Sequence, residues 1–168
     1  MSQLTVLLNS QHQKSRFSCG KELLDDYLHK QVNQDIKRKL SVCFVLTDPE
    51  AKLIKGYYTL SNNSISQELI PEEIHKKLPR SYTSIPTTLL GRLAIDQNYQ
   101  GQGIGKLLLV DALKRSYDLS KTIGSFAVIV DPIDQNAENF YLKYGFVKLP
   151  DSGKMFLPMK TIGQLFDS

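Results

Sequence analysis

The sequence has few of the residues that form disulfide frameworks, metal sites or histidine-based catalytic centres. Its 168 residues include only two cysteines, Cys19 and Cys43, and three histidines. The cysteines have no metal-ligand spacing, so we predict reduced structural thiols and no metal. The histidines His12, His29 and His75 stand among polar residues and are expected at the solvated surface. No general base can be named from the sequence.

Long hydrophobic runs, internal repeats and low-complexity linkers are also missing. The first residues, "MSQLTVLLNSQHQ", carry a short apolar run and no basic leader. A signal peptide needs such a leader, and a membrane-spanning helix needs about 20 apolar residues. We therefore expect a cytoplasmic protein without a membrane segment, folded as a single domain over residues 1–168.

The composition is that of an ordinary globular protein with a mild basic excess. Hydrophobic residues make up 41% of the chain, charged residues 23%, and the net charge is +4. This charge is compatible with an anionic cofactor, an RNA or an acidic partner. The basic residues cluster in three runs, which are usually solvated faces: Lys37, Arg38 and Lys39; Lys76, Lys77 and Arg80; Lys114 and Arg115.

The first half of the chain reads as one amphipathic helix followed by strands. Ser18 is available as the N-cap of the helix, and residues 37–39 lie at its C-terminal end. Residues 41–47 and 53–60 are expected to form an antiparallel hairpin. A short helix is expected from Pro71, and an exposed loop at residues 80–86. The apolar positions with helical spacing are Leu23, Leu24, Tyr27, Leu28, Val32 and Ile36.

The second half alternates strands and helices. Strands are expected at 87–96 and 124–131, helices at 104–119 and 134–145, and late strands at 146–150 and 154–160. Gly145 should close the second helix. This order predicts an α+β or mixed α/β domain, with helices on both faces of one sheet. The wide apolar face of the helix at 104–119 comprises Leu107, Leu108, Val110, Ala112 and Leu113.

The stretch "YQGQGIGK" places three glycines at alternate positions immediately before the predicted helix at 104. Free N–H groups at a helix start attract anions, so glycines that allow close approach favour a phosphate site. The spacing differs from that of a P-loop or a dinucleotide-binding fingerprint. A tight turn without a ligand is the alternative.

Gln100, Gly103 and Gly105, together with "NAENFYLKYGF" downstream, resemble the motifs of the GNAT N-acetyltransferases. The resemblance implies a central twisted mixed sheet flanked by helices, and acetyl-CoA as cosubstrate. Backbone at Leu93, Ala94 and Ile95 would pair with its pantetheine arm, and Asn136 would add a contact. Asp134 departs from the asparagine that is common in the family. The pyrophosphate would be held by the N–H groups of Gln100, Gly101, Gln102, Gly103, Ile104, Gly105 and Lys106.

The N-terminal half and "LLGRLAID" extend the likeness to acetyltransferase toxins of bacterial toxin–antitoxin modules. That resemblance implies charged tRNA as acceptor, a small ribbon-helix-helix antitoxin, a homodimer, and tRNA contacts at Lys37, Arg38, Lys39 and Arg92. The alternating strand places Arg92 on the face of Leu90 and Ala94. It either points beside the acetyl group or pairs with an acid at an interface.

Acetyl transfer to an amine needs a proton for the departing thiolate, and the resemblance makes Tyr141 the candidate donor. On spacing alone, the alternative is a core aromatic that shares its helix with Phe140 and Tyr144. An α-amine with a pKa of about 8 is partly neutral at pH 7 without a base, which favours an aminoacyl ester over a lysine. The predicted function is therefore acetylation of the α-amine of aminoacyl-tRNA, which would block translation. The alternatives are acetylation of a small amine or a protein N-terminus, and a non-catalytic CoA- or RNA-binding module.

Overall fold

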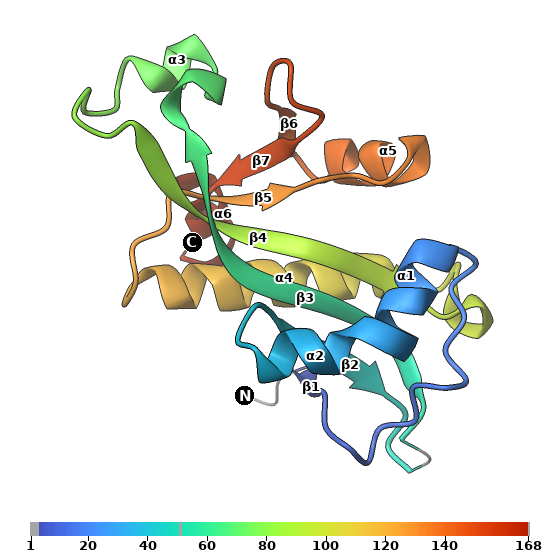
Figure 1. The fold of residues 1–168 in the computed structure, drawn as a ribbon. Helices are drawn as coiled ribbons and strands as arrows, with labels where there is room; N and C mark the ends of the chain where they lie inside the picture. The colour runs from blue at the N-terminus through green and yellow to red at the C-terminus, as the bar shows by residue number, and fades with distance from the viewer. Residues whose placement is uncertain (1–3, 51, 168) are drawn as a thin grey trace. The chain divides into compact units, whose positions relative to one another are not determined.

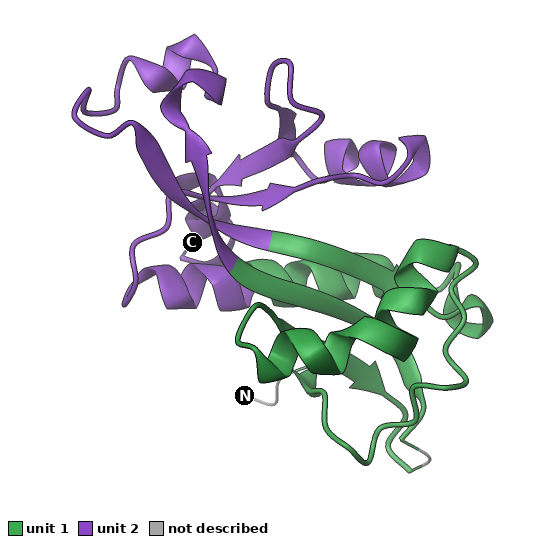
Figure 2. Ribbon diagram, in the orientation of Figure 1, with its two compact units in different colours: residues 1–61, 90–113 green, residues 62–89, 114–168 purple. Residues whose placement is uncertain are grey.

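The computed structural model describes residues 4–50 and 52–167. The chain divides into two compact units (Figure 2). Unit 1 contains residues 1–61 and 90–113, and unit 2 contains residues 62–89 and 114–168. The division passes through β3, β4 and α4, so each of these three elements contributes to both units.

Seven strands form one mixed sheet in the order β1-β2-β3-β4-β5-β7-β6 (Figure 1). β4 and β5 are parallel, whereas the pairs β1–β2, β2–β3, β5–β7 and β6–β7 are antiparallel. The predicted mixed α/β fold is confirmed. The strands are β1 (Val6–Leu7), β2 (Val42–Thr47), β3 (Ile54–Ser66), β4 (Ser84–Ile95), β5 (Ala127–Val130), β6 (Val147–Lys148) and β7 (Met155–Pro158).

The helices largely follow the sequence pattern, with differences at their ends. The short helix after Pro71 and the helices after the glycine loop and after Asp134 are confirmed. The expected loop at 80–86 is wrong from Ser84 onward, because β4 starts there and buries Ile85. The helical elements are α1 (Glu22–Asp26), η1 (Tyr27–Gln31), α2 (Val32–Lys37), η2 (Gln67–Leu69), α3 (Glu72–His75), η3 (Gln97–Tyr99), α4 (Ile104–Ser120), α5 (Gln135–Lys143) and α6 (Met159–Phe166).

Two further predictions about helices are corrected. Residues 159–160, expected in a strand, begin α6, because β7 ends at Pro158 and the proline occupies the N-cap position of that helix. In α4, Leu107 and Val110 are 50% and 41% exposed, so they do not belong to its buried face. The buried face consists of Leu108, Leu109, Ala112 and Leu113.

The amphipathic N-terminal helix is interrupted by a π-helical turn, η1. In a π-helix, positions five apart lie on one face, so Tyr27 and Val32 can both be buried beside Leu28. Ser18 is not the N-cap. The helix begins at Glu22, and the Ser18 N–H instead donates to Asp96 at 3.0 Å.

The core of unit 1 lies between this helical segment and the β2–β3 hairpin. Tyr57 is fully buried there, and its hydroxyl donates to the Leu24 carbonyl at 2.7 Å. Gly56, the neighbouring residue in β3, allows Leu108 and the Ala94 carbonyl group to lie close to the β3 backbone. A Cβ on it would lie 2.7 Å from Leu108 Cδ1 and 3.0 Å from the Ala94 carbonyl oxygen.

We therefore expect Gly56→Ala to destabilise the protein by about 1–3 kcal/mol, the usual cost of overpacking a core. The Ala94 oxygen is backbone and cannot turn away as a side chain can. Chemical denaturation measures the change. Gly124→Ala is the matched control, because a Cβ there meets nothing within 4 Å; it should change stability by less than about 0.5 kcal/mol. Equal effects of the two substitutions would contradict the packing argument.

The core of unit 2 forms around β5, whose residues are all buried. β5 pairs with β4 at Thr88↔Val128 and Leu89↔Ile129, and with β7 along its whole length. Residues before β4, at its start and after β5 complete this core: Ile65, Ile70, Ile85, Leu149 and Phe156.

The two cysteines are free and buried, as predicted. His29 is exposed, as predicted, and His12 and His75 are half-buried. His12 Nδ1 accepts from the Asn9 N–H at 3.0 Å, and His75 Nε2 lies 2.7 Å from Gln67 Oε1. His29 Nε2 lies 2.8 Å from the Phe17 carbonyl oxygen. Within residues 4–50 and 52–167, no helix is long and apolar enough to cross a membrane, and no cluster of potential metal ligands occurs.

Candidate active site

The glycine loop lies in unit 1 between η3 and α4. Gly101 and Gly103 have φ angles of +80° and +76°, which residues with a side chain rarely adopt. A Cβ on either residue would meet nothing within 4 Å, so both positions face open space. The glycines therefore serve the conformation of the loop and leave its outer surface free for a ligand.

Side chains hold the base of this loop in place. Gln100 Nε2 donates to the carbonyl oxygens of Ile95 and Cys19, each at 2.8 Å. Asp96, 5% exposed, accepts from the N–H groups of Ser18 at 3.0 Å and Asn98 at 2.9 Å. These bonds fix the loop both to the end of β4 and to the segment that precedes α1.

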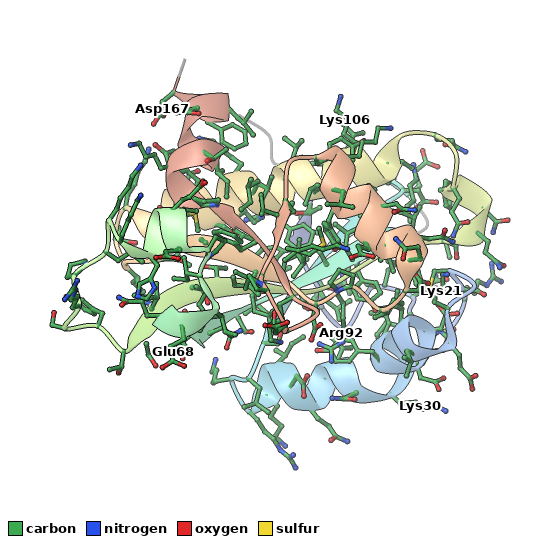
Figure 3. All side chains as sticks on the ribbon, turned by 90° about the horizontal axis from the view of Figure 1, so that it is seen from above. Lys21, Lys30, Glu68, Arg92, Lys106 and Asp167 are labelled. Carbon is green, nitrogen blue, oxygen red and sulfur yellow. The ribbon has the colours of Figure 1, made fainter. Side chains whose placement is uncertain are left out.

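The loop leads directly into α4, which runs from Ile104 to Ser120. The first N–H groups of such a helix have no partner inside it and carry a partial positive charge. Lys106 stands in the first turn and is exposed, and Figure 3 shows its side chain pointing outward. Free N–H groups, unobstructed glycines and a nearby cation together form a cradle that fits a phosphate group.

The strand before the loop offers backbone groups of its own. The pairing of β4 with β5 covers Thr88 and Leu89, whereas β4 continues to Ile95. Ala94 is buried, and Leu93 and Ile95 are half-buried. The predicted pantetheine-binding residues therefore lie beyond that ladder, where an extended ligand can add as a further strand.

Tyr141 is placed by the C-terminal end of α5 in unit 2. Gly145, with φ +94°, ends the helix in a Schellman motif, in which the Phe146 N–H donates to the Tyr141 carbonyl at 3.1 Å. The chain then returns Phe146 against Tyr141, with ring centroids 5.2 Å apart. The sequence "FYLKYGF" thus encodes the position of the tyrosine ring.

The Tyr141 side chain is 7% exposed, and within the described residues its hydroxyl has no hydrogen-bond partner. Burial raises the pKa of Tyr141 above that of a free phenol. The group is therefore protonated at neutral pH and able to donate. It is also a weaker acid than a free phenol, so proton release must accompany the build-up of charge on the acceptor atom.

The residue that departs from the family pattern, Asp134, lies at the start of α5. Asp134 is the N-cap of the helix, and its side chain accepts from the Ala137 N–H at 2.8 Å. Asn136 lies in the first turn and is exposed. The cofactor contact predicted for Asn136 is not tested by this geometry and stays a prediction.

Arg92 and the first basic run both lie in unit 1. The Arg92 guanidinium carbon stands 3.5 Å from the centre of the Tyr27 ring. Lys37, Arg38 and Lys39 are exposed at the end of α2. Lys39 has φ +62°, and the Leu40 N–H donates to the Asp35 carbonyl at 2.9 Å, which places the triplet in a Schellman motif.

Sequence reasoning missed the two residues that organise this part of the molecule, Asp96 and Tyr27. An aspartate directly after a strand and before a polar tripeptide is a signal for an Asx turn, and would have identified Asp96. For Tyr27 the sequence carries no such signal, because its partner Arg92 is distant in the chain.

Comparison with known proteins agrees with these motifs. A family model described as the acetyltransferase (GNAT) domain matches residues 40–148. A curated relative from Mycobacterium tuberculosis, named tRNA-acetylating toxin, is 34% identical over 145 residues, which cover 86% of this chain and 84% of the relative.

Solved structures extend the likeness to the whole chain. AtaT complexed with acetyl-methionyl-tRNAfMet has a TM-score of 0.89 and 30% identity, covering 96% of this chain and 98% of that one. A tyrosine-to-phenylalanine mutant of AtaT, bound to the C-terminus of the antitoxin AtaR and acetyl-CoA, has a TM-score of 0.83 and 27% identity, covering 98% of each chain. The chain belongs to the GNAT acetyltransferase family.

Proposed function

We propose that this protein is an acetyl-CoA-dependent toxin that acetylates the α-amine of aminoacyl-tRNA, thereby blocks translation, and is neutralised by a cognate antitoxin. The observation that carries the proposal is similarity over nearly the whole chain to a tRNA-acetylating toxin and to AtaT in complex with acetyl-methionyl-tRNA. The matched region of the family model, residues 40–148, spans both units. We infer that the units work together as one acetyltransferase domain.

The glycine loop and the end of β4 are the proposed acetyl-CoA site. Acetyl-CoA supplies the acetyl group as an activated thioester. The N–H groups of residues 100–106 bind its phosphates, with the positive end of α4 behind them. The backbone of residues 93–95 orients the extended arm, and Asn136 is a further proposed contact. No metal is required by this arrangement.

Tyr141 is the proposed proton donor to the departing thiolate. Its burial keeps the phenol protonated, and the ring is held by Phe146 and Phe140, whose centroids lie 5.2 Å and 5.3 Å away. A fixed ring with a free hydroxyl costs little reorganisation when the proton moves. Tyr141 is therefore assigned to catalysis, whereas Phe140 and Phe146 hold it in position.

The α-amine of an aminoacyl ester suits a site without an assigned general base. With a pKa of about 8, roughly a tenth of such an amine is neutral at pH 7, against less than about one part in a thousand for a lysine. The rate at low acceptor concentration should rise with pH until the amine is deprotonated. Water suffices to take the proton.

The basic run at the end of α2 is the proposed tRNA-binding surface. We expect the triple change Lys37→Glu, Arg38→Glu and Lys39→Asp to raise the KM for charged tRNA at least about tenfold, because each lost phosphate contact forfeits counterion release. Aspartate is chosen at position 39 because it tolerates positive φ better than glutamate does. The KM for acetyl-CoA should not change. Steady-state kinetics at several salt concentrations measure both constants, and the salt dependence should become shallower.

A charge-matched control uses the second basic run, with Lys76→Glu, Lys77→Glu and Arg80→Glu. These residues are also exposed but belong to the other unit. A similar increase in KM from both triple variants would show that net charge matters rather than a local contact. An unchanged KM in the first variant would remove residues 37–39 from the tRNA surface.

The partners follow from the same comparison. A structural neighbour carries the C-terminus of an antitoxin, so we infer that an antitoxin peptide binds this toxin too. The ribbon-helix-helix class of the antitoxin and a homodimeric toxin belong to this proposal. To neutralise the protein, the antitoxin has to cover Tyr141, the basic surface or the cofactor loop.

A cell-free translation system tests the function. Added protein should stop translation only when acetyl-CoA is present. After the protein is removed, fresh charged tRNA should restore synthesis, whereas fresh ribosomes or messenger RNA should not. Restoration by ribosomes instead would place the target on another component and refute the proposal.

A further inference from the structure

Arg92 is a guanidinium that the fold holds in place without using its hydrogen-bond donors. It stacks on the Tyr27 ring, 3.5 Å from the ring centre, and forms no ion pair or hydrogen bond with any other described residue. A guanidinium stacked over a ring keeps its N–H groups directed outward in its own plane, parallel to the ring. These groups form a fixed fork for an oxyanion.

Tyr27 is itself held from two sides. Its hydroxyl donates to Asp35 Oδ2 at 2.8 Å, and its ring lies near-parallel to Tyr57, with centroids 6.5 Å apart. The side chain is only 3% exposed. Burial and the Asp35 bond raise the pKa of Tyr27 to about 12, so the phenol stays a donor to Asp35 over the physiological range. Arg92 therefore stacks on a ring that is itself held in place.

The position of Arg92 along β4 relates it to the proposed cofactor site. It directly precedes Leu93, the first of the backbone groups assigned to the cofactor arm, and the phosphate cradle lies at the other end of that segment. The thioester end of an arm that runs back along β4 thus reaches Arg92. When the acceptor amine lies at the thioester, the charged groups nearest to that amine lie beside the Arg92 guanidinium.

We propose that Arg92 binds one backbone phosphate at the single-stranded acceptor end of the charged tRNA, with Tyr27 as the positioning residue for its guanidinium. The inference rests on the proposed function, since it takes charged tRNA as the acceptor. The phosphate next to the esterified nucleotide is the nearest anion on such a substrate. The bond is charge-assisted and bidentate, which is why lysine cannot replace arginine here.

Equilibrium binding of an RNA hairpin with the acceptor end of tRNA tests this without turnover. Each terminal phosphate is replaced in turn by a neutral methylphosphonate, and affinity is followed by fluorescence anisotropy. In the wild-type protein, the replacement at one phosphate position should lower the RNA affinity about tenfold, the scale of a charged hydrogen bond. Arg92→Gln should lose that affinity and no longer respond to the replacement at that position. Arg92→Lys should also lose the position-specific response, although it retains the charge.

The same binding measurements test the positioning role of Tyr27. Tyr27→Leu removes the stack and should weaken binding of the unmodified hairpin by between about 2-fold and 10-fold, at most the loss of the whole Arg92 contact. Tyr27→Phe retains the ring and should restore most of the affinity. Combining Tyr27→Leu with Arg92→Gln should add nothing to Arg92→Gln alone. Tyr57→Phe, which removes a hydroxyl bond from the same aromatic cluster, should leave RNA affinity unchanged.

The outcomes separate this proposal from the proposed function. If Arg92→Gln responds to every methylphosphonate as the wild type does, Arg92 binds no phosphate and the inference is overturned, whatever the enzyme acetylates. If the wild type binds no RNA and acetylates only small amines, both proposals fail. A loss of thermal stability in Arg92→Gln with normal RNA binding would leave Arg92 as packing alone.

Discussion

Tyr141→Phe is expected to lower kcat by about 10²-fold or more while leaving the fold and the acetyl-CoA affinity unchanged. General acids contribute on this scale, and the change removes one hydroxyl from a ring that packing holds in place. Phenylalanine retains the contacts with Phe140 and Phe146. Single-turnover kinetics measure the chemical step, and calorimetry with acetyl-CoA measures binding.

Tyr144→Phe is the matched control for this change. Tyr144 also packs against Phe140, with centroids 5.1 Å apart, but lies at the C-cap of α5 and is half-buried. Its hydroxyl has no assigned role, so the rate should stay close to that of the wild type. A near-normal rate in Tyr141→Phe would leave Tyr141 as a packing residue and favour the non-catalytic alternative.

Gly103→Glu is expected to weaken acetyl-CoA binding by about 100-fold or more. The position faces open space at the entrance to α4, so the new side chain would stand where the phosphates bind. Its carboxylate would then face phosphate, and like charges in contact cost several kcal/mol. Calorimetric titration with acetyl-CoA gives the dissociation constant.

Gly153→Glu controls for backbone strain. Gly153 has φ +71° and, like Gly103, a Cβ there meets nothing within 4 Å, so both substitutions impose the same local penalty. Only Gly103 belongs to the proposed cradle. Gly153→Glu should bind acetyl-CoA normally, and a folded Gly103→Glu variant with unchanged affinity would place the cofactor elsewhere.

The sequence predicted local structural features well. The hairpin at β2 and β3, the glycine loop before α4 and the closure of α5 at Gly145 each depend on residues close together in the chain. The fold class followed from their order. The motif residues Gln100, Gly103 and Gly105 also identified the family, because their spacing reflects one backbone conformation.

What the sequence did not predict depends on distant partners. Gln100 was expected to act through its backbone, yet its side chain bonds to Cys19, 81 residues away. Ser18 was expected to cap a helix, but its N–H is taken by Asp96. The π-helical turn at Tyr27 arises because tertiary packing buries adjacent residues, which helical periodicity alone does not indicate.

The most direct test of the central claim is a competition for the acetyl group. Purified protein is given labelled acetyl-CoA with charged tRNA, a peptide with a free N-terminus and a small primary amine together. The account predicts label on the α-amine of the aminoacyl ester, recovered as an N-acetyl amino acid after alkaline release from the tRNA, and none on uncharged tRNA. Label on the peptide or the small amine, with charged tRNA unlabelled, would contradict it.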